Sequence, residues 1–100
     1  TEKQEKITMF NASKITRKFL QKHLDYEGDI WKHLYEKQNR MIAIEKLSRL
    51  FGLSQSQKIE LEGILHAMAI NSLAYQHHRA RNVYNQSYLN FKSIFSNEIQ

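Results

Sequence analysis

Cysteine and proline are absent from this sequence, and glycine occurs only at positions 28, 52 and 63. A chain without cysteine can form neither a disulfide nor a thiolate metal site, so the disulfide-stapled secreted miniproteins are excluded. We therefore expect an intracellular protein, cytoplasmic by default. Because proline and glycine are the residues that most often interrupt helices, their scarcity predicts an all-α fold.

Long apolar runs are also missing. None approaches the roughly 20 residues that a membrane-spanning helix needs, and residues 1–6 are polar or charged with no apolar segment behind them. The sequence thus predicts neither a membrane span nor a signal peptide. Of the 100 residues, 41% are hydrophobic and 25% are charged, which is typical of a folded chain with one core. We expect a single helical domain over residues 1–100.

The first two helices are predicted from their end signals. One helix should begin near Thr8 or Asn11 and run to about Asp25, with Gly28 in the left-handed conformation that ends helices. Asp29 is a good N-cap for a second helix over about 30–51. Since apolar residues surround most of that second helix, it should lie in the middle of the fold.

The next helix boundary is predicted at residues 52–54. Gly52 can end the second helix, and Ser54 can cap the third. Gln57 follows Ser54 by three residues, which is the capping-box spacing. A helix should therefore start directly after Ser54.

The segment 55–99 carries one apolar face in constant phase. Its members recur at steps of three and four: Ile59, Gly63, His66, Ile70, Leu73, His77, Ala80, Tyr84, Tyr88, Phe91 and Phe95. A single helix of about 40 residues would be about 60 Å long, too long for a domain of this size to cover. We expect a break at 82–87, where asparagine, glutamine and serine gather. The prediction is a three- or four-helix bundle whose C-terminal helix, about 55–82, either continues or resumes over about 86–97.

Aromatic side chains form the last part of this face. Tyr84, Tyr88, Phe91 and Phe95 share one side of the helix, with Ile94 beside them. Either the terminal helix folds back and these side chains complete the core, or it projects and they dock on another molecule. The second alternative is our first functional hypothesis, a non-enzymatic protein-interaction module with a protein partner or a homodimer.

An excess of positive charge supports a second hypothesis, a small nucleic-acid-binding regulator. The net charge is +5, and residues 1–50 hold eleven of the fifteen basic side chains. Phosphate contacts could come from Lys14, Arg17, Lys18 and Lys22 on the first helix and from Arg79 and Arg81. Contact with a membrane surface through the same first helix is not favoured.

A helix-turn-helix-like element over about 44–61 would add base contacts to this second hypothesis. Gln55 and Gln57 lie at the start of its second helix, where side chains could reach base edges. Lys58 departs from the motif, because it occupies a position where an aliphatic residue normally packs. Any capped junction between two helices gives a similar pattern.

Catalytic and metal-binding patterns are not found. The five histidines form no H-x-x-x-H pair and have no cysteine beside them, and there is no glycine-rich phosphate loop and no Ser, His and acid set. We therefore expect no metal, no cofactor and no enzymatic activity.

Overall fold

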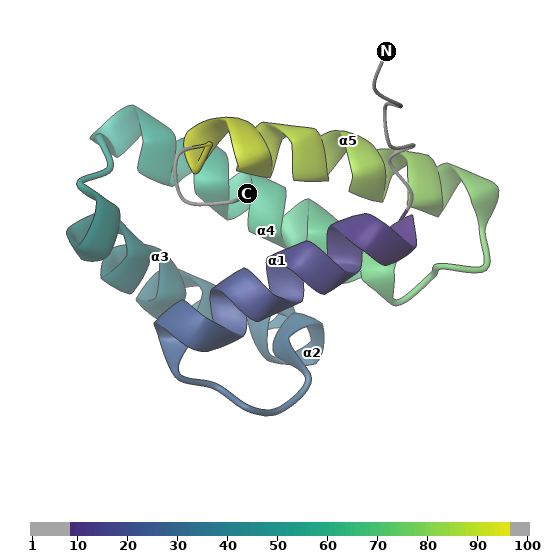
Figure 1. Ribbon diagram of the computed structural model, residues 1–100, viewed down its shortest axis with the longest axis horizontal. Helices are drawn as coiled ribbons and strands as arrows, with labels where there is room; N and C mark the ends of the chain where they lie inside the picture. Colours follow the sequence, from purple (N-terminus) through teal and green to yellow (C-terminus); the bar gives the residue numbers. More distant parts are fainter. Residues whose placement is uncertain (1–8, 97–100) are drawn as a thin grey trace, which may run out of the picture.

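The computed structural model describes residues 9–96, with side chains from residue 12 onward, and this part of the chain contains helices and no strand (Figure 1). The helices are α1 (Met9–Leu24), α2 (Ile30–Tyr35), α3 (Lys37–Phe51), α4 (Gln55–Ser72) and α5 (His78–Ile94). The prediction of an all-α fold is confirmed. In the first predicted helix, the alternative start at Thr8 lies outside the described residues.

The helices α3, α4 and α5 are antiparallel neighbours in succession, the short α2 packs on α4, and α1 crosses the bundle (Figure 1). α3 and α4 are joined by the turn at Gly52, and α4 and α5 by a longer turn, while α1 lies across α5, α3 and α2 (Figure 1). α4 packs against α2, α3 and α5. The expected central position of the 30–51 segment is wrong, because Met41, Ile42 and Leu50 of α3 are exposed.

The first helix ends within one residue of its predicted end, but a different residue takes the left-handed conformation. α1 stops at Leu24, and Asp25, not Gly28, takes the left-handed conformation, with φ of 55°. A Cβ at Gly28 would lie 2.8 Å from the Tyr26 hydroxyl, so the glycine allows the tyrosine side chain to pack closely against the backbone. Asp29 does cap the next helix, since the Lys32 N–H donates to its carboxylate at 3.4 Å.

The predicted helix 30–51 is interrupted at Glu36, whose backbone is extended. Side chains from α3 satisfy the carbonyl groups at the end of α2. Asn39 donates to the His33 carbonyl at 2.9 Å, and Arg40 donates to the Leu34 and Tyr35 carbonyls at 3.2 and 2.7 Å. The break is therefore stabilised by contacts that form only when α2 and α3 pack together.

The boundary predicted at 52–54 is confirmed in detail. Gly52 is left-handed at φ 64°, and the Leu53 N–H donates to the Ser48 carbonyl at 3.1 Å. The Gln57 N–H donates to the Ser54 hydroxyl at 3.1 Å, and the Ser54 N–H donates to the Gln57 amide oxygen at 2.9 Å. This reciprocal capping box fixes the start of α4.

The predicted break at 82–87 is wrong, because α5 is continuous there and the chain turns at 73–77 instead. Asn71 and Ser72 close α4 by donating to the carbonyls of Ala67 and Ala69 at 2.7 and 2.9 Å. Such bonds from short polar side chains compete with helix continuation. The turn lets α5 fold back along α4, so no helix of 60 Å forms in a molecule that measures 37 × 32 × 26 Å.

Candidate protein interface

The α4 helix has two apolar faces. The face that packs into the core consists of Leu61, Ile64, Leu65, Met68 and Ala69. The opposite face, here called the outer face of α4, consists of Ile59, Gly63, His66, Ile70 and Leu73, and all five residues are exposed. Ile59, Ile70 and Leu73 keep 66%, 42% and 54% of their surface accessible.

These outer residues are the first half of the face predicted to run through 55–99 in constant phase. That face is not continuous in the fold, because the turn at 73–77 separates an exposed half on α4 from a buried half on α5. The core face of α4 was missed, although its spacing of i, i+3, i+4, i+7 and i+8 is an equally good helical stripe. Two stripes on one helix cannot be ranked by periodicity alone.

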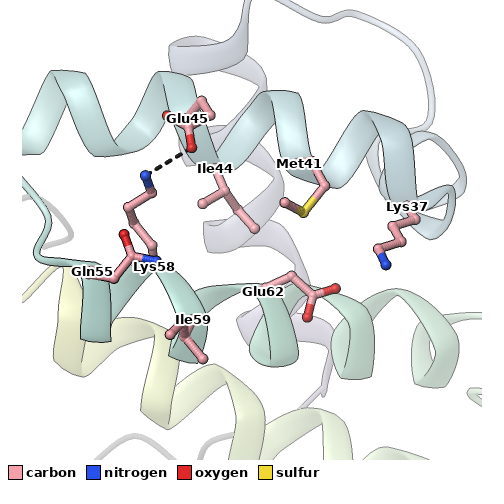
Figure 2. A pocket seen from close by; sticks show the side chains of 8 residues that line it. All are labelled: Lys37, Met41, Ile44, Glu45, Gln55, Lys58, Ile59 and Glu62. Atoms are coloured by element: carbon pink, nitrogen blue, oxygen red, sulfur yellow. Dashed lines mark ion pairs between the residues drawn. The ribbon is translucent and has the colours of Figure 1, made fainter.

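A shallow groove of about 310 Å³ lies beside the outer face, between α3 and α4 (Figure 2). Met41 and Ile44 point from α3 toward α4 and give the groove an apolar floor (Figure 2). The Lys58 ammonium lies 2.8 Å from the Glu45 carboxylate at one end. Hydrogen bonding to Lys58 and its positive charge lower the pKa of Glu45. The groove thus has an apolar centre and charged side chains at both ends, Glu45 with Lys58 at one and Lys37 at the other (Figure 2).

The aromatic side chains that the sequence predicted as an interface lie in the core, away from the outer face of α4. Tyr84, Tyr88, Phe91 and Phe95 are at most 4% exposed, and Ile94 is partly buried against them. The sequence left open whether the terminal helix folds back or projects. In the structure it folds back along α4. These side chains are covered by their own chain and offer no exposed docking surface.

The side chains Tyr84, Tyr88, Phe91 and Phe95 are here called the aromatic stripe. At its C-terminal end, Phe91 and Phe95 contact phenylalanines from two other helices. Phe19 of α1 lies 5.6 Å from Phe91 and 4.9 Å from Phe95, measured between ring centroids. Phe51 at the end of α3 lies 5.4 Å from Phe95. Edge-on and tilted contacts of this kind add to the stabilisation from burial. The four phenylalanines hold α1, α3 and α5 together.

Tyr84 occupies the other end of the stripe. Its ring is fully buried and lies edge-on to Trp31 of α2, with centroids 5.9 Å apart. Burial raises the pKa of Tyr84 to about 12, against a smaller lowering by the nearby Ser13, Trp31 and Arg17 side chains. Within the described chain neither the Tyr84 hydroxyl nor the Trp31 indole N–H reaches good hydrogen-bond geometry. This tyrosine therefore acts as a neutral core residue.

The basic residues predicted for phosphate contact are exposed on α1. Lys14, Arg17, Lys18 and Lys22 share this helix, whose residues 9–24 include no acidic side chain. No ion pair joins these four cations to a carboxylate within residues 9–96. Ser13 and Gln21 line a shallow hollow with three of them. The structure thus gathers a positive surface on one helix.

The other side chains predicted to contact nucleic acid lie on α4 and α5, not on the positive surface of α1. Gln57 is engaged in the cap of α4, and Gln55 lines the groove beside Lys58. Arg79 is exposed near the start of α5, and Arg81 donates to the Tyr75 carbonyl at 2.7 Å. The second helix of the helix-turn-helix-like element presents an apolar outer face, in contrast to the basic surface of α1.

No group of three or more potential metal-binding side chains occurs among the described residues. None of the helices in this part of the chain is both long and apolar enough to cross a membrane. No protein-family model, curated protein sequence or solved structure matches this chain.

Proposed function

We propose that this chain is a non-enzymatic protein-interaction module that docks through the outer face of α4 and the adjoining α3–α4 groove. This keeps the class of function predicted from the sequence but moves the interface away from the C-terminal aromatic stripe. An intracellular location is part of the proposal, because the sequence lacks cysteine.

The observation that supports the proposal is the exposure of Ile59, Ile70 and Leu73 along one side of a helix whose opposite side already fills the core. A helix needs only one apolar face to pack onto its own domain. A second apolar face exposed along the same helix promotes aggregation in solution unless a partner covers it. Met41, which lines the groove and is 44% exposed, widens the same surface.

Site-specific photo-crosslinking in the native host cells tests this proposal. A photoreactive phenylalanine at position 59 should give discrete covalent adducts, because Ile59 would lie inside the interface. The same residue at position 86, exposed on α5, is the matched control and should give at least about tenfold less adduct. Equal yields at the two positions, or none at position 59, would contradict the docking surface.

Nucleic-acid binding is a second candidate function, favoured by the four cations of α1 with no acidic residue among them. Each phosphate neutralised by a lysine or arginine releases condensed counterions, so affinity falls steeply with salt. Four contacts predict a slope of log affinity against log salt of about −3 to −4 on duplex DNA.

Fluorescence anisotropy with a labelled 20-base-pair duplex measures this slope. Replacing Lys14 and Lys18 together by glutamine should make the slope shallower by about 2. The matched pair Lys46→Gln and Arg49→Gln on α3 should leave it unchanged. Absence of binding at low salt would eliminate this candidate.

A further inference from the structure

The outer face of α4 has the spacing of a helix-pairing seam. Ile59, Gly63, His66, Ile70 and Leu73 follow one another at steps of four, three, four and three residues, which is the alternation of a heptad repeat. The exposed stretch from Ile59 to Ile70 is about 17 Å long at 1.5 Å per residue. A seam of this kind fits a second helix packed along α4.

Gly63 is the unusual member of this seam. It lies in the interior of α4, where glycine weakens a helix, and a Cβ placed on it meets nothing within 4 Å. Packing among the described residues therefore gives no reason for a glycine at this position. A partner helix that approaches closely at Gly63 would give one.

The order of side chains on the seam is complementary to itself in the antiparallel direction. With a two-fold axis between Gly63 and His66, Ile59 faces Ile70 of the other copy, and Gly63 faces the imidazole of His66. Large side chains then meet large ones at the ends, while each histidine fits over a glycine in the middle. Beyond these layers, Leu73 covers the small Ser56, and Glu60 lies beside the uncharged Ala67 instead of another carboxylate.

The parallel direction fits poorly. It would place glycine opposite glycine and histidine opposite histidine, which leaves a gap next to a crowded polar layer. Gaps and crowding in a packed interface both cost stability. The same sequence therefore favours one direction of pairing over the other.

We infer that the occupant of the outer face of α4 is a second copy of this chain, paired antiparallel about a two-fold axis between Gly63 and His66. This inference rests on the proposed function and names its partner. Two-fold symmetric pairing through one shared patch is the commonest form of protein self-association.

Disulfide trapping tests the direction of pairing, and the absence of native cysteine makes each introduced thiol unique. In the antiparallel pair, position 59 lies opposite position 70 but about 17 Å from its own copy. The double variant Ile59→Cys and Ile70→Cys should therefore form covalent dimers under oxidising conditions, at least about tenfold more than either single variant. Single variants that crosslink as well as the double variant would overturn the antiparallel arrangement.

Sedimentation velocity of the variant Gly63→Leu provides a second, independent test. The added side chain points into open space in the monomer, so the melting temperature should stay equal or rise. In the dimer it would meet His66 of the partner, so the dissociation constant should rise at least about tenfold. The control Gln86→Leu adds the same side chain to the exposed surface of α5 and should leave dimerisation unchanged. Tighter association of the Gly63→Leu variant would overturn the inferred packing.

Self-pairing and protein interaction can be rejected separately. A strictly monomeric chain whose position 59 still crosslinks to a different protein would reject the second copy and retain the interaction module. A monomeric chain with no adduct at position 59 would reject both.

Discussion

Replacing Phe91 by alanine should lower the free energy of unfolding by about 3–5 kcal/mol. Phe91 is fully buried, and its ring contacts those of Phe19 and Phe95 at centroid distances of 5.6 and 4.9 Å. The substitution removes a large apolar side chain and leaves a cavity where α1 meets α5. Because a domain of this size is stable by only about 5–15 kcal/mol, the loss is a large fraction of the total.

Urea denaturation followed by circular dichroism measures this loss, with sedimentation velocity run on the same samples. Leu89→Ala is the matched control, since Leu89 lies on the same helix with 40% of its surface exposed and should cost much less. If Phe91→Ala is too unstable to purify, Phe91→Leu should cost about 1 kcal/mol and still fold. A variant at Phe91 that loses association but keeps full stability would show that the aromatic stripe is an interface after all.

Replacing Arg40 by methionine should lower the free energy of unfolding by about 2–4 kcal/mol. Arg40 is 4% exposed, and its guanidinium donates to the carbonyls of Leu34 and Tyr35 as well as to Glu62 at 3.1 Å. Methionine fills a similar volume but leaves the two carbonyls at the end of α2 without this donor. Lysine at position 40 should not restore stability, because it lacks the planar set of donors that bridges three acceptors.

Thermal and urea unfolding of Glu62→Gln separates the two roles of Arg40. The Glu62 side chain is 34% exposed and can be hydrated by solvent when its charge is removed, so this change should cost only about 1 kcal/mol or less. A loss from Glu62→Gln as large as that from Arg40→Met would mean that the ion pair, and not the bonds to the α2 carbonyls, dominates.

Local signals in the sequence were sufficient for some features of the fold. Few helix breakers predicted an all-α chain, and Gly52 with Ser54 predicted the α3–α4 boundary because both act through bonds within a few residues. The same kind of signal is present at Asn71 and Ser72, whose side chains end α4, but the polar cluster at 82–87 is richer and predicts the break there instead.

Other features depend on contacts that local patterns do not contain. The break at Glu36 has no glycine or proline, and it is stabilised by Arg40, whose other partner is Glu62 on α4. The candidate interface was predicted only in part. An apolar seam on 59–73 was recognised, yet its exposure follows from the position of the turn at 73–77 and from a better-filled opposite face of α4.

The edge-on contact between Trp31 and Tyr84 makes the chain's own fluorescence a probe of folding. Trp31 is the only tryptophan, it is 1% exposed, and it is absent from the outer face of α4. Its emission should be at short wavelength in the native state and move to the red when the core opens. Pairing of two folded copies should leave that emission nearly constant, so spectra and sedimentation profiles would report two separate equilibria from one unlabelled sample.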